Sequence, residues 1–250
     1  MFFHDSFTAI IEAHDDYKLC ARRLFQSAYQ GEFVYDPVLE PDRVEAASLA
    51  GFMPMSADIA NAIYFTPKLH TLRCMMDPAS VHVSKSARRE SRRYNIAMNL
   101  DFTGTLLSCA AEHGDDWLSM ELCSAFMSLH AQRHKRSAAF ISCELLYGSD
   151  VVAGEVGYLI GGAYASLSGF TNVSGAGTVQ LVAMAGLLAA QGVRVWDLGM
   201  PIQYKVTLGA DMLRRPAYIP LLESAYALPR PQALVDEIEP CSAFSILEAR

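Results

Sequence analysis

The sequence predicts an α+β protein with a smaller N-terminal domain, residues 1–94, in front of a larger domain, residues 95–250. The first observation is the order of patterns after residue 94, where helical stretches precede several strand-like ones, as is typical of this class. The second is a proline- and aromatic-rich stretch at 52–78, which interrupts regular structure before a boundary near Tyr94. The third is length, since 250 residues can bury the core of one large or two small domains.

Helical patterns account for much of the first domain. Residues 5–29 carry an irregular apolar stripe and predict a helix. Residues 43–50 predict a short helix that ends at Gly51, because glycine commonly terminates helices. Residues 84–94 predict another helix, with Ser84 as its N-cap.

The second domain is predicted to combine a strand hairpin with three longer helices. If Gly161 and Gly162 form a two-residue turn, counting pairs Ile160 with Ala163 and Glu155 with Ser168. The tail from Pro229 is rich in proline and predicts no element. The expected elements are a strand at 95–100, helices at 101–113 and 119–134, strands at 138–147, 151–160 and 163–170, a helix at 177–191, a strand at 193–197 and a short helix at 202–208.

Composition excludes several classes of protein. The chain is 52% hydrophobic and has no apolar run of membrane-spanning length, and acidic residues stand where a signal peptide would be basic, so we expect a cytoplasmic protein. The six cysteines contain no CxxC pair, which argues against a zinc or redox motif. His130 and His134 are spaced for one helix face, but with no third ligand in the pattern we expect no metal. The net charge of −7 argues against a general nucleic-acid coat but allows one basic face.

Five cations lie within nine residues of the segment HVSKSARRESRRY, with only Glu90 opposing them. Helical spacing aligns most of them on one face, and the fork of arginine suits phosphate oxygens. The alternative is an ordinary solvated helix face. The cations that predict a phosphate-binding surface are Lys85, Arg88, Arg89, Arg92 and Arg93.

A glycine loop, SGAG at 174–177, opens the helix at 177–191, and Asp197 lies at the end of the following strand. Such a loop can point free N–H groups at an anion, although close helix–strand packing explains small residues equally well. Asp197 is a candidate proton acceptor for an attacking amine. The alternative is a structural hydrogen bond to Tyr204 or Lys205, which follow closely enough to fold back.

Aromatic residues are candidates for the wall of an apolar pocket, although each alone is equally suited to the core. They are Tyr64, Phe65, Trp117, Phe170 and Trp196.

The order of these segments resembles the leucyl/phenylalanyl-tRNA–protein transferase family over roughly residues 51–222. The most specific match is HVSKSARR at 82–89, which is similar to the family's His-[Ile/Val]-Ser-Arg-Ser and the basic residues after it. The other matches are GFMPMS at 51–56, YFTP at 64–67, DWLS at 116–119, SLH at 128–130 and WDLGMPIQYKVTLGA at 196–210.

The resemblance implies an acyl-CoA N-acyltransferase-like (GNAT-like) fold for the second domain. It also implies N-end-rule-type transfer of an apolar amino acid, such as leucine or phenylalanine, from aminoacyl-tRNA to the N-terminal amine of an acceptor protein, with no metal and no CoA. We expect a monomer. Asp197 would orient the amine, the basic helix would hold tRNA, and the substrate-binding residues would be Tyr64, Phe65, Trp117, Leu167, Ser168, Phe170, Gly199, Tyr204 and Lys205.

Three polar positions of the family's site differ in this chain. Leu167 stands where the family has a Glu, Gly199 where it has a Gln, and 177–178 where it has Ser-Lys. Because the expected pairing puts Glu155 beside this strand position, our hypothesis is that Glu155 replaces the missing carboxylate and is catalytic together with Asp197. Two alternatives stay open: a CoA-dependent N-acetyltransferase, or a catalytically silent relative that binds tRNA or peptide.

Overall fold

The computed structural model describes residues 2–5, 8–10, 15–26, 31–113 and 117–249. Its centre is an eight-stranded mixed sheet in the order β12-β6-β11-β10-β9-β8-β7-β13. These strands are β6 (Leu72–Met76), β7 (Asn95–Met98), β8 (Ala139–Tyr147), β9 (Asp150–Ile160), β10 (Ala163–Thr171), β11 (Val195–Gly199), β12 (Asp211–Arg214) and β13 (Ile238–Ser242).

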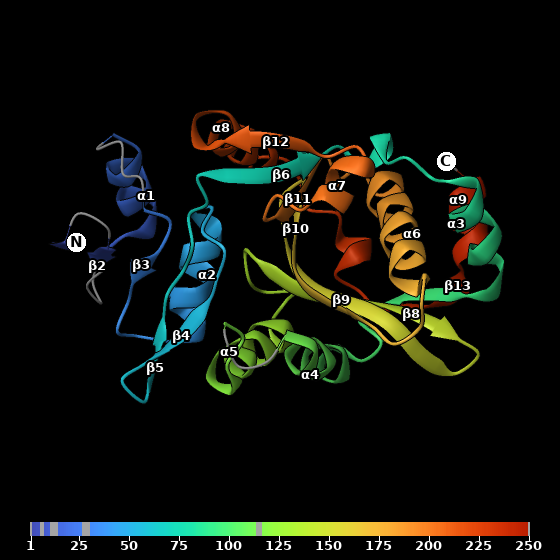
Figure 1. Cartoon of the computed structure of the whole chain (residues 1–250), viewed down its shortest axis with the longest axis horizontal. Coiled ribbons are helices and arrows are strands. Elements are labelled where there is room, and N and C mark those ends of the chain that lie inside the picture. Colours follow the sequence, from blue (N-terminus) through green and yellow to red (C-terminus); the bar gives the residue numbers. More distant parts are fainter. Residues whose placement is uncertain (1, 6–7, 11–14, 27–30, 114–116, 250) are drawn as a thin grey trace.

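Helices cover both faces of this sheet (Figure 1). One face packs against α6 (Ala176–Ala190), with α3 (Lys85–Glu90) and α9 (Ala243–Glu248) beyond it. The opposite face packs against α4 (Phe102–His113) and α5 (Met120–Ala131). The long hairpin β8–β9 forms because apolar strand residues flank a glycine turn, in which Gly148 has a φ of 64°. The α+β class is therefore confirmed.

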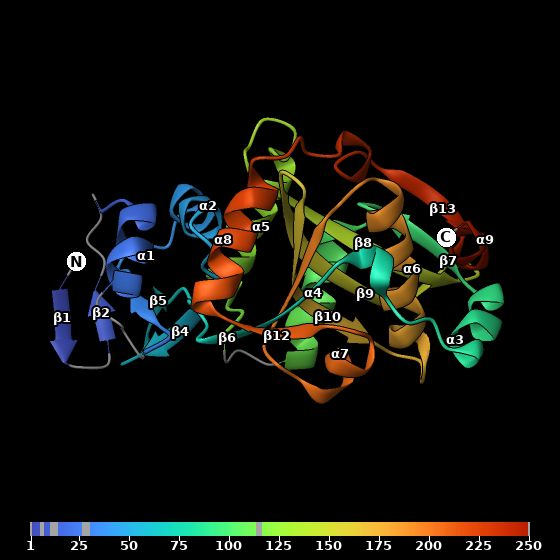
Figure 2. The ribbon, with the colours of Figure 1, turned by 90° about the horizontal axis from the view of Figure 1, so that it is seen from above.

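The segments before β6 lie at one end of the sheet, as Figure 2 shows. They comprise β1 (Phe2–Asp5), β2 (Thr8–Ile10), α1 (Tyr17–Gln26), β3 (Val34–Tyr35), α2 (Pro41–Leu49), β4 (Ser56–Ile59) and β5 (Ala62–Phe65). The remaining short elements are α7 (Gln203–Thr207) and α8 (Arg215–Tyr226), with 3₁₀ turns at Pro78–Ser80, Ser91–Arg93 and Gln232–Leu234. No helix of the described ranges has the length and apolar character needed to cross a membrane.

Several sequence expectations hold closely. Ser84 caps α3 by accepting a hydrogen bond from the backbone N–H of Ala87 at 3.1 Å. Helix α2 ends before Gly51, whose φ of 83° is a conformation that glycine adopts without strain. Ile160 pairs with Ala163 across the Gly161–Gly162 turn as counted.

Other expectations were wrong. Within the helix expected over 5–29, the structure has a strand at Thr8–Ile10 and the helix α1 at Tyr17–Gln26, while residues 6–7, 11–14 and 27–29 lie outside the described residues. Strand β6 joins the large sheet, so this sheet contains residues from both sides of position 94. The tail, for which no element was predicted, supplies β13 at the sheet edge and α9. Pro240 is exposed within β13, and the register with β7 shifts between Ile238 and Cys241, as is common where a strand contains a proline.

The pairing expected for Glu155 is also off by one residue. The register between β9 and β10 shifts between Ser166 and Ser168, so Leu167 is an extra residue on β10. Such a bulge changes the pairing of every residue after it. Glu155 therefore pairs with Gly169, and Val156 pairs with Ser168.

Candidate functional site

Strands β10 and β11 run parallel but separate beyond one point in the sheet. Their pairing ends at Ala165 and Asp197, although β10 continues to Thr171 and β11 to Gly199. Ligands of α/β sheets commonly bind where the carboxyl ends of parallel strands diverge. The divergence therefore places a candidate site between the end of β10, the end of β11 and α7.

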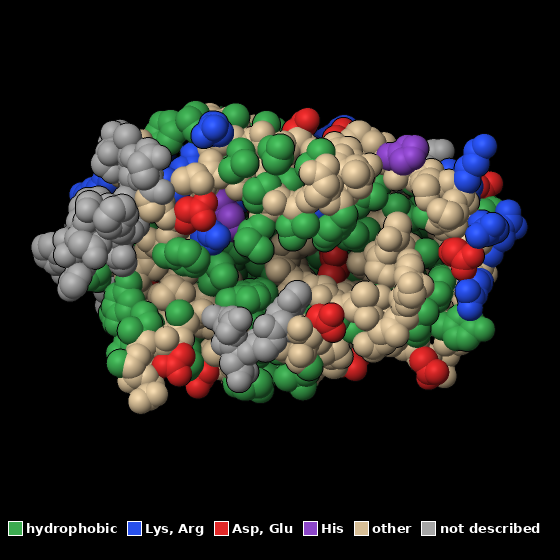
Figure 3. Space-filling model, in the orientation of Figure 1, with side chains coloured by type: hydrophobic (Ala, Val, Ile, Leu, Met, Phe, Trp, Pro, Cys, Tyr) green, Lys and Arg blue, Asp and Glu red, His purple; other side chains and the backbone are tan. Residues whose placement is uncertain are grey.

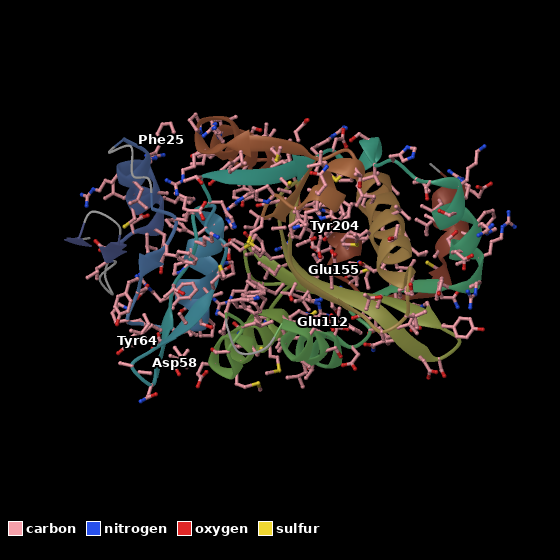
Figure 4. All side chains as sticks on the ribbon, in the orientation of Figure 1. Phe25, Asp58, Tyr64, Glu112, Glu155 and Tyr204 are labelled. Carbon is pink, nitrogen blue, oxygen red and sulfur yellow. The ribbon has the colours of Figure 1, made fainter. Side chains whose placement is uncertain are left out.

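A hollow opens in the molecular surface beside α7. Figure 3 shows an acidic side chain at its floor, where Figure 4 labels Glu155 on β9, with Tyr204 of α7 above it. Glu155 is only 3% exposed, whereas Tyr204 is 48% exposed at the rim. A nearly buried carboxylate at the bottom of an open hollow can meet a small ligand while bulk water is largely excluded.

Hydroxyl groups hold the Glu155 carboxylate in place. Tyr164 donates a hydrogen bond to Oε1 at 2.8 Å and Ser166 donates to the same oxygen at 3.1 Å. Trp196 donates from its indole Nε1 to Ser166 Oγ at 2.8 Å, which orients that hydroxyl. Burial raises the pKa of Glu155, and the hydrogen bonds from Tyr164, Ser166 and Gln180 offset this rise only in part.

Lys205 reaches the same region from α7. Its Nζ donates to the backbone carbonyl of Met200 at 3.2 Å and also to that of Leu198. Burial lowers the pKa of Lys205, while the carboxylates of Asp197 and Glu155 act in the opposite direction. The lysine thus lies within electrostatic reach of both acids and fixes the loop that leaves β11.

Asp197 is fully buried, and its partner is Arg73 of β6. The guanidinium Nη1 lies 2.9 Å from Asp197 Oδ2 and also donates to the carbonyl of Gly51 at 3.1 Å. Burial lowers the pKa of Arg73, but interactions with Asp197 and with the neighbouring tyrosines outweigh this effect, so the pKa is raised. The expected structural bond from Asp197 to Tyr204 or Lys205 is replaced by this ion pair.

Asp197 and Glu155 point to opposite faces of the sheet. Trp196 packs with Tyr164 in the core beneath α6, on the face that carries Glu155. Neighbouring strand residues alternate, so Asp197 faces the other side, where Arg73 stacks on Tyr218 with 4.7 Å from Cζ to the ring centroid. The structure brings both acids to the diverging strands but not to one surface.

Gly199 supports the conformation of the strand end. Its N–H donates to Asp197 Oδ1 at 2.9 Å, and its φ of 70° is left-handed. A Cβ at this position would lie 3.1 Å from Met53 Cε, so no longer side chain fits here without movement. A side chain at this position is therefore disfavoured by the left-handed backbone and needs a movement of Met53.

The remaining expected substrate-binding residues fall into two groups. Leu167 on its bulge is partly exposed, whereas Ser168 and Phe170 of β10 are buried, with exposed fractions of 7% each. The other aromatic residues lie elsewhere: Phe65 is fully buried against Tyr17, Tyr64 packs on Tyr35, and Trp117 packs partly buried near α4 and α5.

The basic helix α3 is exposed at the far end of the sheet, and α6 lies between it and β10 (Figure 1). Three arginines of α3 and of the 3₁₀ turn after it are engaged within the protein: Arg88 pairs with Glu248, Arg93 pairs with Glu90 at 3.0 Å, and Arg92 stacks on Phe244. Arg89 lies 3.5 Å from Glu90 and is well exposed. Lys85 has no acidic partner in the part of the chain that the structure describes.

The glycine loop begins α6 with Gly175 as its N-cap, in a left-handed conformation with a φ of 82°. No side chain caps this N-terminus. The loop residues 171–175 are exposed at the mouth of the diverging strands.

Sequence reasoning missed Arg73. A signal for it existed, because Arg73 is the single charged residue in the apolar stretch LRCMM and such a residue in a strand needs a buried partner. His70 was also missed; burial and the nearby Arg73 lower its pKa to about 2, so a neutral ring accepts a hydrogen bond from Arg73 Nη2 at 3.2 Å.

A raised-pKa carboxylate and a lowered-pKa lysine beside one hollow are typical of an enzyme active site. The hollow thus has the features of an enzyme active site. A family model described as leucyl/phenylalanyl-tRNA protein transferase matches residues 75–223. The chain belongs to this family, which confirms the resemblance and the expected class of aminoacyltransferase.

Individual relatives agree with the family model. The chain is similar to the leucyl/phenylalanyl-tRNA–protein transferase of Paracoccus denitrificans, with 31% identity over 80% of this chain and 96% of the relative. It is 29% identical to the enzyme of that name from Jannaschia, covering 77% of this chain and 89% of the relative. The enzyme of that name from Magnetococcus marinus is 26% identical, with 81% and 86% covered.

Proposed function

We propose that the protein transfers an apolar amino acid, leucine or phenylalanine in kind, from aminoacyl-tRNA to the N-terminal amine of an acceptor protein. Family membership supports the reaction type. The main observation in favour of this active site is the environment of Glu155, whose carboxylate is nearly buried, has a raised pKa and lies at the floor of the hollow. We propose with it that residues 95–250 have the acyl-CoA N-acyltransferase-like arrangement, supported by the diverging pair β10–β11, and that the enzyme is a cytoplasmic monomer.

The reaction is the aminolysis of an ester. The acceptor nitrogen attacks the aminoacyl carbonyl carbon and forms the C–N bond, and the C–O bond to the ribose of the tRNA then breaks. Glu155 takes the proton that the attacking nitrogen loses, and this proton passes to the leaving ribose oxygen. A raised pKa suits this role because a proton acceptor works best when its pKa approaches the working pH.

Lys205 supports the charge that develops on the carbonyl oxygen. Its ammonium group is fixed by the carbonyls of Leu198 and Met200 at the diverging strands. A preorganised cation in a partly dry site stabilises such an oxyanion more strongly than it would in water. Its geometry is set by β11, whose end is anchored through Asp197.

Asp197 contributes by holding the strand end. Its charge is neutralised by Arg73, and its second oxygen accepts the N–H of Gly199. An ion-paired, fully buried carboxylate on the opposite face is better suited to positioning than to proton transfer. We therefore assign the proton acceptor to Glu155 and the shape of the β11 loop to Asp197.

Apolar side chains beside the hollow suit a leucine or phenylalanine donor. Met200, Ile202 and Tyr204 are 51%, 41% and 48% exposed around α7, and Leu167 lies partly exposed on β10. The buried Ser168 and Phe170 would support this wall from behind. Tyr64, Phe65 and Trp117 lie outside this group and would act on the donor only after rearrangement.

Charged total tRNA and peptides of differing N-terminal residue test the reaction. We expect a mass gain of one leucine or phenylalanine residue on a peptide with N-terminal arginine or lysine, and loss of that gain with Glu155→Gln. Addition of an acetyl group from acetyl-CoA would instead establish a CoA-dependent acetyltransferase. Binding of aminoacyl-tRNA without any mass gain would establish a silent relative.

A further inference from the structure

A second hollow, remote from Glu155, lies between α1, the end of α2 and α8. Its volume is about 580 Å³, within the range of about 300–1,000 Å³ that ligand sites occupy. Its wall is mainly apolar: Phe25, Leu49, Ile219 and Leu222 contribute, and Phe25 is 47% exposed (Figure 4). An apolar hollow of this size on the surface of a protein is typical of an interaction site.

Cations stand at the edge of this hollow. Lys18 and Arg22, one turn apart on α1, line it together with a single acid, Glu223. Neither cation has an acidic partner within the described ranges, and both are exposed. In a protein of net charge −7, two unneutralised cations beside an apolar wall favour a partner that carries both apolar side chains and carboxylates.

The hollow continues into an elongated groove. A neighbouring hollow of about 450 Å³ shares Lys18, Leu49 and Tyr226 with it and adds Arg136 and Arg230. Arg136 is already paired with Asp42 and Glu45, so Lys18 and Arg22 supply the unneutralised charge. Two adjoining hollows, the first of them mainly apolar, fit a peptide segment better than a compact ligand or a row of phosphates.

The groove floor contacts the structure that supports the candidate active site. Gly51 lines the groove and its carbonyl accepts a hydrogen bond from Arg73, the partner of Asp197. Tyr226 also lines it, and Asp197 contributes to the raised pKa of this tyrosine. A chain seated in the groove therefore lies one layer of side chains from β11, whose end borders the Glu155 hollow.

We propose that this α1–α2–α8 groove binds an acidic, apolar segment of the acceptor protein, some distance after the N-terminal residue that is modified. The inference rests on the proposed function, since it assumes a protein acceptor. Apolar side chains of the segment enter the hollow beside Ile219 and Phe25, and carboxylates pair with Lys18 and Arg22. The groove thereby selects acceptors by a feature other than their N-terminal residue.

Binding of a labelled peptide tests the groove without any transfer reaction. The probe is a fluorescent peptide rich in leucine and glutamate, and its counterpart has lysine at each glutamate. We expect Lys18→Glu with Arg22→Glu to weaken binding of the glutamate probe about tenfold, as expected for the loss of about 1.4 kcal/mol. The control is Arg23→Glu, which reverses one charge on α1 outside the lining, half the charge change of the double variant, and it should leave binding within about twofold.

A floor variant makes the test independent of the charge change. Ile219→Asn should abolish binding of the glutamate probe, with the unfolding midpoint measured to establish that the protein is folded. Equal binding of the lysine counterpart to the wild type, or equal weakening by Arg23→Glu, would overturn the proposal. If either groove variant fails to fold, the binding of the two probes to the wild-type protein still tests whether the groove prefers an acidic segment.

Transfer assays separate this inference from the proposed function. The wild-type enzyme should prefer a long acceptor with the acidic, apolar segment over a short peptide with the same N-terminus. The double variant should lose this preference while its rate with the short peptide is unchanged. Failure of the wild type to modify any acceptor would count against the proposed function alone, because probe binding reports on the groove directly.

Discussion

The guanidinium of Arg73 and the carboxylate of Asp197 lie 2.9 Å apart in the fully buried interior, joining β6 to β11. Burying two charges costs free energy that their attraction offsets only when further hydrogen bonds complete the geometry. Here the carbonyl of Gly51 and the neutral ring of His70 accept from the guanidinium, and Gly199 donates to the carboxylate. The pair thus fixes the end of β11 in one conformation.

Removing one partner should therefore destabilise the fold strongly. Arg73→Met leaves a buried, unpaired carboxylate and should lower the free energy of unfolding by about 3–5 kcal/mol. Asp197→Asn leaves a buried, unpaired guanidinium and should lower it by a similar amount. The double variant Arg73→Met with Asp197→Leu should recover much of this loss. Urea unfolding of the three variants measures the coupling.

An exposed pair provides the control for this cycle. Arg93 and Glu90 lie 3.0 Å apart on the surface, where solvent screens their attraction. Arg93→Met should leave the unfolding midpoint almost unchanged. A double variant at the buried pair that is no more stable than the single variants would contradict the expected recovery. It would show that the hydrogen bonds to Gly51, His70 and Gly199, rather than the pairing of the two charges, determine the loss of stability.

Glu155→Gln should abolish transfer while the protein stays folded. The amide keeps the size and the hydrogen-bond acceptor for Tyr164 and Ser166 but cannot take a proton. Glu144→Gln is the matched control, since Glu144 is also buried with a raised pKa but accepts from Leu100 and Thr105 beside α4. Retained activity in Glu155→Gln would show that another group is the proton acceptor.

The raised pKa of Glu155 also predicts the direction of a pH effect on stability. The folded protein holds the proton more tightly than the unfolded chain, whose glutamates titrate near about 4.3. The free energy of unfolding should therefore fall as pH rises from about that value through the raised pKa. Glu155→Gln should remove part of this fall, and denaturant unfolding across the acid range measures it.

Transfer should change with pH in the opposite sense. Neutral Glu155 cannot accept a proton, so the rate should rise as pH increases through its raised pKa. A pH profile of kcat/KM for the wild-type enzyme, with single-turnover controls for the acceptor amine, measures this rise. A rise at the ordinary glutamate pKa would indicate that the carboxylate is solvated during catalysis.

Local chemistry made much of the fold predictable. The hairpin at Gly148, the end of α2 at Gly51 and the cap at Ser84 depend on residues within a few positions. The edge strand at 238–242 was missed, and the short strand at 72–76 was not placed in the large sheet, because their partners lie far away in the sequence. Their short apolar patterns do not differ from those of a loop or a buried turn.

The candidate site was predictable by residue type but not by geometry. Glu155 and Lys205 were named from the sequence; Glu155 lies at the floor of the hollow, and Lys205 lies within electrostatic reach of it. The bulge at Leu167 shifted the pairing by one residue, and alternation along β11 turned Asp197 to the opposite face. Neither effect is visible in a sequence, because a bulge follows from packing across strands.

The cations of α3 should differ in their effect on tRNA binding. Lys85 and Arg89 are exposed, whereas Arg88 is engaged by Glu248 and a backbone carbonyl. Lys85→Ala and Arg89→Ala should each weaken tRNA binding and reduce the slope against log salt by about 0.9. Arg88→Ala should have the smaller effect on the slope, and filter binding over a salt series measures all three.

Removing the acidic partner of Arg88 should have the opposite effect on tRNA binding. Glu248→Gln removes the ion-pair partner of Arg88 and should strengthen tRNA binding and steepen the salt slope. An unchanged slope in every variant of α3 would establish an ordinary solvated face, and the phosphate-binding surface would lie elsewhere.

Gly199→Ala should impair transfer more than it impairs folding. The left-handed φ of 70° costs an alanine about 1–2 kcal/mol, and the added Cβ would lie 3.1 Å from Met53 Cε, a flexible side chain that can move. Gly192→Ala is the matched control, since Gly192 has a φ of 77° but no atom within 4 Å of the added Cβ and lies at the far end of α6. Both variants should lower the free energy of unfolding by similar amounts, but only Gly199→Ala should shift the loop that holds Lys205 and reduce kcat. Equal kcat values for the two variants would show that the end of β11 does not position the reacting groups.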